Sequence, residues 1–540
     1  MDQNNIIMIE PAENELRTTR RHVGVRFEDL GSTVNGVLAS AGRYPGRRAV
    51  EDAGICWTYA DLRDQIVTAV RACIAWGIEP GDRVGLCASN SAAWILAALG
   101  IQGAGGILIP LNTRFKGDEL AYILRAGGAR YVLAEDLAVR RGLVREAGGS
   151  DLAGVRWADM SDWAAWSAFA DLGHAVPESE ALGRIGALTP ADVSDILFTS
   201  GTTGYPKGVI FSHGQSLRAY GELGIGFGFT PADRYLLIPP FFHALGYKSG
   251  WFAGFLHGCA ILPERKFDAA RMADRIERDR VTMMIGPPTI FSELLVRAGG
   301  GDRDFSSLRL IVPSATSVPP ELVGRMRAEL GVDVLTGYGL TEASAIVTYS
   351  RVGDDPELVS DSVGRPAPGV EVTITDDDDR ELPAGQTGNV LVGGYTVMTG
   401  YWEDPGATAA AVMPDGRLRT GDVGSVDEHG FLRITGRKKD IILVGGFNVY
   451  PAEVERFLAL HPLVADVGVV GVPDERLGEV PWAFVVPVTG GAIDKTEFLA
   501  WARTRMANFK APRTVVVVDS LPRNSSMKVL RDELRRLTRQ

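Results

Sequence analysis

The chain has 540 residues, of which 45% are hydrophobic and 23% charged, and this composition excludes overall disorder. A net charge of −11 argues against a general nucleic-acid binder, whose surface is usually basic, but leaves room for a local nucleotide site. Four scattered cysteines without a CxxC spacing predict neither a disulfide framework nor a zinc site, and they favour a reducing cytoplasmic location.

No secretory signal or transmembrane segment is expected. Residues 1–24 mix polar and charged groups without an apolar core, and we interpret them as an N-terminal extension. The longest apolar stretch, Ala92–Leu111, is interrupted by Gln102 and several glycines, so it favours a helix followed by a strand over a membrane span.

From residue 25 onward, short apolar runs alternate with helical patterns. Arg83–Ala88 and Gly106–Pro110 read as strands on either side of a helix at Ala92–Leu99, which is a βαβ pattern typical of a parallel sheet. Similar strand candidates follow at Tyr131–Leu133, Tyr235–Ile238, Thr282–Ile285 and Leu308–Val312. The fold class is therefore α/β, with a large N-terminal lobe of stacked, mostly parallel sheets and helices.

The pattern changes after about residue 360. Short alternating segments such as Val370–Ile374 and Asn389–Val392 predict a β-rich subdomain, and Asp376–Asp379 reads as a solvated hairpin tip. Beyond Arg437–Asp440, strand and helix patterns alternate again over the last hundred or so residues. We expect a large domain at 25–436, a hinge at 437–440 and a small, mobile α+β domain at 441–540.

The first chemical motif runs from Thr199 to Gly208, TSGTTGYPKG, and follows the strand candidate Ile196–Phe198. Its glycines allow backbone N–H groups to approach an anion, its hydroxyls donate hydrogen bonds, and Lys207 adds a positive charge. The candidate phosphate-binding residues are Thr199, Ser200, Gly201, Thr202, Thr203 and Lys207. A flexible Gly/Thr turn is the alternative, and the GxxxxGK[ST] phosphate loop is excluded because neither Ser nor Thr follows Lys207.

This loop resembles the signature of the adenylate-forming superfamily, which includes acyl-CoA synthetases, firefly luciferase and peptide-synthetase adenylation domains. The likeness extends from about residue 25 to about residue 535. It implies an acid–thiol ligase that uses ATP and Mg²⁺ to make an acyl-adenylate, and then CoA to make a thioester.

Two further motifs lie in the order that the resemblance implies. Gly337-Tyr338-Gly339-Leu340-Thr341-Glu342 is similar to the family motif in which Tyr338 stacks on adenine, Thr341 touches the α-phosphate and Glu342 binds Mg²⁺. Asp422, in RTGD, would accept hydrogen bonds from the ribose, although an aspartate after glycine also commonly forms an Asx turn.

The resemblance also assigns residues around the domain boundary. Arg437 would contact the nucleotide, and Lys439 would be the hinge. The segment Gly445-Gly446-Phe447 would line the tunnel for the pantetheine arm of CoA. Near the end, Lys528 would be the adenylation lysine that bridges the carboxylate and the α-phosphate.

By the same resemblance, His243 in PFFH gates the acid pocket, or alternatively packs as an ordinary histidine beside aromatic rings. The expected pocket residues are Phe242, His243, Tyr247, Trp251, Gly286 and Pro287. Glycines at every fourth position from Gly246 to Gly254 would admit a wide, ring-bearing acid or allow close helix packing. Lys248 is expected to snorkel to solvent, with contact to a distal oxygen of the substrate as the alternative. These stretches resemble actinobacterial ligases for fatty or polycyclic propanoic acids.

Two departures from the family concern the nucleotide side. The adenine-facing loop reads Ser314-Ala315-Thr316 where glycine and alanine are usual, and Met527 stands before Lys528 in place of glycine. Either these are tolerated variants, or adenylation is weakened and only thioesterification remains. In the second case, a separate adenylating enzyme would supply the acyl-adenylate.

Three other functions stay open at this point. The chain could load a carrier protein, because the carrier arm and CoA present the same thiol. It could be an inactive homologue that binds acyl-adenylate, although Lys207, Glu342, Asp422, Arg437 and Lys528 are all present. A luciferase-like oxygenase fits the general chemistry of the family less well. A homodimer is compatible with the sequence.

Overall fold

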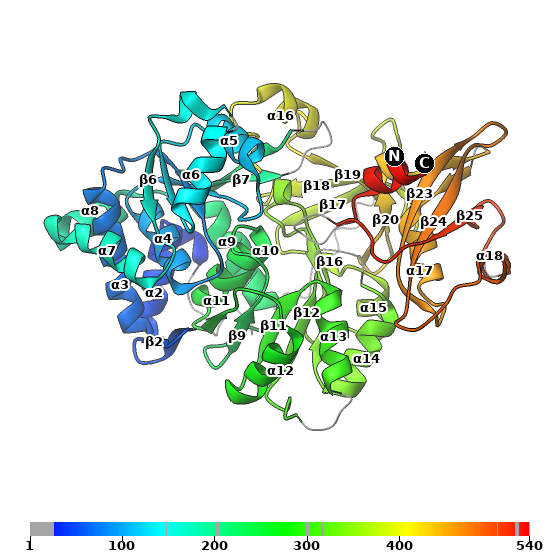
Figure 1. Cartoon of the computed structure of the whole chain (residues 1–540), viewed down its shortest axis with the longest axis horizontal. Helices are drawn as coiled ribbons and strands as arrows, with labels where there is room; N and C mark the ends of the chain where they lie inside the picture. Colours follow the sequence, from blue (N-terminus) through cyan, green and yellow to red (C-terminus); the bar gives the residue numbers. More distant parts are fainter. Residues whose placement is uncertain are drawn as a thin grey trace, which may run out of the picture.

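The computed structural model describes residues 26–146, 148–199, 205–298, 303–314, 318–445, 447–504, 506–523 and 529–538. Two large sheets and their helices form the N-terminal lobe, a β-rich region follows, and the C-terminal domain lies at one end (Figure 1). Within the described ranges, no helix has both the length and the apolar character needed to cross a membrane.

The first large sheet has six strands in the order β6-β5-β3-β4-β7-β8. Its strands are β3 (Arg83–Cys87), β4 (Ile107–Pro110), β5 (Tyr131–Ala134), β6 (Arg156–Asp159), β7 (Val193–Thr199) and β8 (Lys207–Ser212). Every pairing is parallel except the hairpin of β7 and β8. The predicted βαβ unit is confirmed, and its helix is α4 (Ala92–Gly103), which is buried along its whole length.

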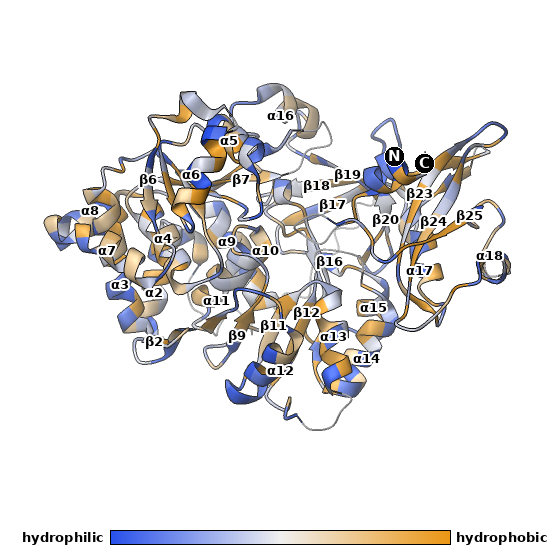
Figure 2. Cartoon of the chain, viewed as in Figure 1, coloured by the Kyte–Doolittle hydropathy of each residue, from blue (hydrophilic) through white to orange (hydrophobic). Residues whose placement is uncertain are grey.

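The second large sheet has seven strands in the order β13-β12-β11-β9-β10-β1-β2. Its strands are β1 (Arg48–Asp52), β2 (Ile55–Thr58), β9 (Arg234–Leu237), β10 (Ala260–Pro263), β11 (Met283–Gly286), β12 (Leu310–Pro313) and β13 (Asp333–Val334). Only the β1–β2 pair is antiparallel. The strands β11 and β12 are strongly apolar, whereas α12 shows hydrophilic residues on its outer side (Figure 2).

Helices cover these sheets and fill the space between them. The longer ones are α2 (Thr33–Arg43), α3 (Tyr59–Ala75), α5 (Gly117–Ala126), α6 (Leu137–Glu146), α7 (Trp163–Asp171), α8 (Glu178–Ala187), α9 (His213–Gly226), α12 (Ala269–Arg278), α13 (Pro288–Ala298) and α14 (Pro320–Leu330). Three short segments follow one another after β9: α10 (Ala244–Gly246), the π-helical η4 (Tyr247–Phe252) and α11 (Ala253–Leu256). The stacked, mostly parallel α/β lobe is therefore as predicted.

The predicted β-rich subdomain is an antiparallel sheet of four strands: β17 (Val370–Thr375), β18 (Gly388–Gly394), β19 (Leu418–Val426) and β20 (Leu432–Arg437). The smaller elements around it are β14 (Gly337–Tyr338), η5 (Thr341–Ala343), β15 (Thr348–Tyr349), α15 (Pro356–Asp361), β16 (Arg365–Pro366) and α16 (Pro405–Ala411). The acidic run joins β17 to β18 as a tip, but it also makes ion pairs. Asp379 pairs with Arg419 at 2.5 Å and Asp377 with Lys438 at 2.7 Å.

The C-terminal domain has its own sheet and core, as an α+β domain should. Its elements are β21 (Ile442–Val444), β22 (Phe447–Val449), α17 (Pro451–Leu458), β23 (Val464–Asp474), β24 (Gly478–Pro487), α18 (Lys495–Arg503), β25 (Thr514–Val517) and α19 (Arg531–Leu537). Just before it, β20 ends at Arg437 and a 3-10 turn spans Lys438–Asp440. Asp440 is buried and faces Arg531 and Arg535 of α19, whereas Lys439 is exposed.

Candidate active site

Three neighbouring parallel strands end at one edge of the seven-stranded sheet. β9 ends at Leu237, β11 at Gly286 and β12 at Pro313, and the loops after them carry His243, Pro287 and Ser314. The Ser314 N–H donates to the Gly286 carbonyl at 2.8 Å, which holds two of these loops together. In open α/β sheets, ligands bind outside the carboxyl ends of the strands, so the predicted acid-side residues lie at a suitable edge.

The predicted phosphate loop connects two paired strands. Thr199 ends β7, Lys207 begins β8, and the two are direct cross-strand partners. The chain between them includes the expected phosphate ligands Ser200, Gly201, Thr202 and Thr203, which lie outside the described residues. Its two described ends are therefore held next to each other.

Glu342 joins this loop to the YGLTE motif. Its carboxylate accepts hydrogen bonds from the Thr199 hydroxyl at 3.3 Å and from the Tyr401 hydroxyl at 3.0 Å. The Lys207 ammonium lies 5.2 Å from the centre of the Tyr401 ring. Residues from three distant parts of the chain thus bring a carboxylate, two hydroxyls and a cation together, as a site for metal-bound phosphates requires.

Tyr401 is a site residue that the sequence analysis missed. It reaches Glu342 because the segment around it lies along β8: Tyr401 bridges to Val209, and the Trp402 N–H donates to the Gly208 carbonyl at 2.7 Å. Burial, followed by the charge of Glu342, raises the pKa of Tyr401 well above its usual range, so the hydroxyl stays a donor. No local motif marks this tyrosine, because its role depends on a pairing between distant segments.

A second polar cluster consists of Tyr338, Asp422 and Arg437. The Tyr338 hydroxyl donates to the Asp422 carboxylate at 2.5 Å, and Arg437 Nε lies 3.0 Å from the other carboxylate oxygen. Burial and Asp422 together raise the pKa of Tyr338. Asp422 is buried between these two partners, so its side chain makes contacts beyond those of an Asx turn.

The chain between these two clusters is tightly packed. A side chain at Gly339 would place its Cβ 2.2 Å from the backbone of Ala345, so only glycine fits there. Ser344 and Ala345 have positive φ angles of 54° and 55°, and they follow directly after the turn Thr341–Ala343. This strained backbone fixes Thr341 and Glu342 relative to Gly337 and Tyr338.

On the acid side, Phe242 and His243 are half-buried, whereas Tyr247 and Trp251 are buried. The Tyr247 and Trp251 rings stack with centroids 4.9 Å apart, and the Gln102 amide donates to the Tyr247 hydroxyl at 2.8 Å. The glycine strip is close packing: Cβ atoms would lie 2.2 Å from the Pro239 carbonyl at Gly246 and 2.6 Å from Ile261 at Gly254. The strip therefore packs on the protein's own backbone and core and does not form an open wall.

The expectation that Lys248 snorkels to solvent is wrong. Its side chain is fully buried, and its ammonium lies 2.8 Å from the Asp195 carboxylate and 2.9 Å from the Ser216 hydroxyl. It also lies 4.5 Å from the centre of the Tyr247 ring. Burial lowers the pKa of Lys248, and the charge of Asp195 opposes this shift. A buried carboxylate on β7 compensates the charge, and an apolar sequence context could not reveal that partner.

The C-terminal domain contributes Gly445 and Phe447 to the described part of the predicted CoA tunnel. Gly445 has a φ of 57°, and the exposed Phe447 ring stacks on Phe509 with centroids 4.8 Å apart. The other predicted residues that lie outside the described part of the chain are Ala315, Thr316, Gly446, Met527 and Lys528. Their roles stay predictions.

The residues present fit a magnesium ion that is held mainly by phosphates. Glu342 offers one carboxylate, and in the described ranges no three His, Cys, Asp or Glu side chains gather as a protein-only metal site. Magnesium commonly takes one or two carboxylates and completes its shell with phosphate oxygens and water. Glu342 is therefore the residue that would hold it.

Comparisons with known proteins agree with this geometry. Residues 37–402 match the AMP-binding enzyme family and residues 453–528 match the AMP-binding enzyme C-terminal domain, so the chain belongs to the family of AMP-binding enzymes. The expected adenylate-forming family is confirmed, and the expected hinge lies between the two matched regions.

Two curated relatives carry the same name, 3-[(3aS,4S,7aS)-7a-methyl-1,5-dioxo-octahydro-1H-inden-4-yl]propanoyl:CoA ligase. The protein from Mycobacterium tuberculosis is 45% identical over 89% of this chain and 94% of its own length. The protein from Rhodococcus jostii is 40% identical over 94% of this chain and 99% of its own. Among solved structures, an anthranilate CoA ligase in complex with anthranoyl-AMP superposes with a TM-score of 0.86 at 26% identity, covering 95% of this chain and 99% of its own.

Proposed function

We propose that the chain is an acyl-CoA ligase for a hydrophobic, ring-bearing carboxylic acid of the bicyclic propanoic type. The observation that carries this proposal is the identity of 45% and 40% to two ligases named for such an acid, along nearly their whole lengths. The clusters around Glu342 and Asp422 support the nucleotide half of the reaction.

The first step joins the acid to the nucleotide. The carboxylate attacks the α-phosphorus of ATP, a carboxyl oxygen–phosphorus bond forms, and pyrophosphate leaves. The nucleoside would be oriented by Tyr338, Asp422 and Arg437. The phosphates would be bound by Thr199 and Lys207. Glu342 would hold the accompanying Mg²⁺, and that ion would neutralise phosphate charge. Lys528 remains the proposed bridge between the carboxylate and the α-phosphate.

The second step transfers the acyl group. The CoA thiol attacks the acyl carbon, the carbon–sulfur bond forms, AMP leaves and the thiol proton is released. We propose that the C-terminal domain rotates between the steps about Lys439 and brings Gly445, Gly446 and Phe447 to the pantetheine arm. Asp440 is tied to α19 by its two arginines, which supports a pivot just before it.

A panel of acids tests the substrate. Purified protein with ATP, Mg²⁺ and CoA is given the bicyclic diketone propanoate, a hydroxycinnamic acid and a straight-chain fatty acid, and acyl-CoA is measured by mass spectrometry. We expect kcat/KM for the bicyclic acid to exceed that for the straight chain by at least about tenfold. Preference for the straight chain would overturn the substrate class, and transfer only to a holo-carrier protein would favour carrier loading.

The departures at Ser314, Thr316 and Met527 support a second candidate, in which only the thioesterification step is active. A separate adenylating enzyme would then supply the acyl-adenylate. Exchange of labelled pyrophosphate into ATP, measured beside acyl-CoA formation from synthetic acyl-AMP, separates the two. Exchange that depends on the acid ends the second candidate, and absence of exchange with intact use of acyl-AMP supports it.

A further inference from the structure

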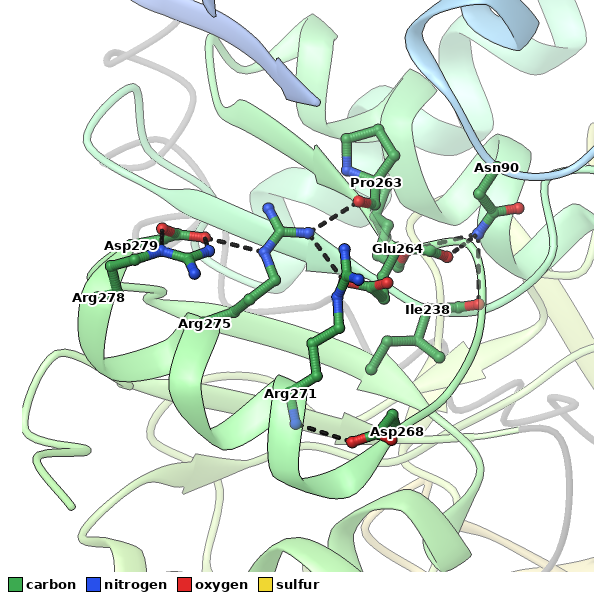
Figure 3. A network of polar contacts seen from close by, with 10 residues as sticks. Asn90, Ile238, Pro263, Glu264, Asp268, Arg271, Arg275, Arg278 and Asp279 are labelled. Carbon is green, nitrogen blue, oxygen red and sulfur yellow. Dashed lines mark hydrogen bonds and ion pairs between the residues drawn. The ribbon is translucent and has the colours of Figure 1, made fainter. Parts of the chain in front are cut away.

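Asn90 is a buried side chain that links the two large sheets. It lies in the turn between β3 and α4, and its amide reaches the end of the other sheet (Figure 3). Its Nδ2 donates to the carbonyls of Pro239 at 3.0 Å, Glu264 at 3.1 Å and Ile238 at 3.3 Å. Its Oδ1 accepts from the Phe241 N–H at 2.8 Å.

The turn that carries Asn90 is itself fixed. The N–H and the hydroxyl of Ser89 both donate to the Glu135 carboxylate, at 3.0 and 2.8 Å. The Ala92 N–H donates to Asp52 at 2.8 Å. The backbone of Asn90 is therefore fixed, and its side chain binds the segment that follows β9.

The segment after Ile238 has few backbone hydrogen-bond donors of its own. It contains Pro239 and Pro240, which have no N–H to donate, so Phe241 supplies the first backbone donor after Ile238. Asn90 binds this donor and the Pro239 carbonyl together. Gly246 then packs against the Pro239 and Pro240 carbonyls, where a Cβ would lie within 2.4 Å of each oxygen. The loop position thus depends on Asn90 at its start.

His243 stands on this loop. Its N–H donates to the Pro240 carbonyl at 3.0 Å, and its Nδ1 accepts from the Leu245 N–H at 3.2 Å, so the neutral ring carries its proton on Nε2. Because the ring is tied to its own loop, any displacement of the loop moves the ring with it. On the far side of His243, the buried Lys248–Asp195 pair holds the π-helical segment.

We propose that Asn90 is a positioning residue of the acid site: it fixes the loop 238–241 and thereby the place of Phe242 and His243 against the carboxylic acid. This inference rests on the proposed function, since His243 borders the acid there. Asn90 makes no hydrogen bond to Tyr338, Asp422 or Arg437; its five hydrogen bonds go to the end of β9 at Leu237, to the loop 238–241 and to Glu264. Its loss should weaken the binding of the acid and leave that of ATP unchanged.

The same network supplies a matched control. The Glu264 carboxylate accepts from Arg271 and from Arg275, each at 3.2 Å, and these arginines lie on α12 (Figure 3). Arg271 is largely exposed. Arg271→Met removes a charged partner of Glu264 but leaves every hydrogen bond of Asn90 in place, so it reports on the network's structural role alone.

Two variants test the proposal. Asn90→Asp keeps the shape and the acceptor for Phe241 but replaces the donating amide with an oxygen facing four carbonyls. Asn90→Ser is a smaller change, in case the aspartate prevents folding. For both, we expect KM for the acid to rise at least about tenfold and KM for ATP to stay within about twofold. Arg271→Met should leave both KM values within about twofold of wild type.

Hydrogen–deuterium exchange of the intact protein gives a readout that does not need activity. The amides of Phe241 and His243 should exchange faster in both Asn90 variants and at the wild-type rate in Arg271→Met. Unchanged exchange there, or an equal rise of KM for acid and for ATP, would overturn the proposal. If wild type forms no acyl-CoA from any acid, the proposed function fails separately, and the exchange data still decide whether Asn90 fixes the loop.

Discussion

Most side chains expected to meet the nucleotide are partly exposed, and several of them contact one another across distant segments, whereas several of those expected to meet the acid are buried in the core. Tyr338, Arg437 and Glu342 keep part of their surface accessible, while Tyr247 and Trp251 are sealed. The nucleotide is the same ligand for every family member, so a recurring sequence motif can recognise it. The acid side depends instead on side-chain packing. Its lysine, Lys248, forms a buried ion pair with Asp195 and so stabilises the fold.

The largest expected effect tests the acid side as a packed structure. Lys248→Met leaves Asp195 buried without its cation, which should lower the free energy of unfolding by about 3–5 kcal/mol. The double variant Lys248→Met with Asp195→Leu should recover most of this loss, because no buried charge remains. Chemical denaturation midpoints check both. A single variant as stable as wild type would show that the pair does not hold this region.

The next largest effect tests whether Glu342, on the nucleotide side, takes part in the reaction. Glu342→Gln keeps an oxygen that can accept from Thr199 or Tyr401 but removes the negative charge for Mg²⁺, so acyl-CoA formation should fall by roughly 10²-fold or more. The denaturation midpoint should change little, since the side chain is only half-buried. Full activity in this variant would remove Glu342 from the metal site.

These two regions also differ in how far the sequence predicts them. The α/β lobe, the β-rich subdomain and the small domain follow from hydrophobic runs and turn residues, with strand ends displaced by a residue or two. Glu342, Asp422 and Arg437 follow from motif resemblance. Tyr401 and the Asp195 partner of Lys248 do not, because their contacts join segments whose proximity exists only in the folded chain.

The third prediction concerns how stability depends on pH through His213, a buried residue of the core. His213 is buried, its Nδ1 accepts from the Thr33 N–H at 3.2 Å, and burial, followed by the charge of Lys248, lowers its pKa to about 3. Unfolded, it would titrate near its ordinary pKa of about 6.5, so its stabilising effect is complete above that pH and is lost as the pH falls toward 3. The stability advantage of wild type over His213→Asn should shrink as the pH falls below 6.5, with a slope that approaches about 1.4 kcal/mol per pH unit. Denaturation midpoints at pH 7, 6 and 5 check this, and a constant difference would contradict it.

The smallest expected effect concerns the contact between the domains. Arg456 of α17 lies 3.4 Å from Asp361 of α15, and both side chains are about half exposed. Arg456→Ala should therefore change stability by no more than about 1 kcal/mol and acyl-CoA formation by less than about twofold. A large loss of the second step alone, measured from synthetic acyl-AMP, would instead show that this pair controls the domain rotation.

The fate of the carboxylate oxygen tests the central claim most directly. The acid is labelled with ¹⁸O in its carboxylate and turned over with ATP, Mg²⁺ and CoA, and the products are weighed by mass spectrometry. If the carboxylate attacks the α-phosphorus and the thiol then attacks the acyl carbon, one labelled oxygen must appear in AMP and one must stay in the acyl-CoA. Formation of ADP, or AMP without label, would contradict an acyl-adenylate route for this protein.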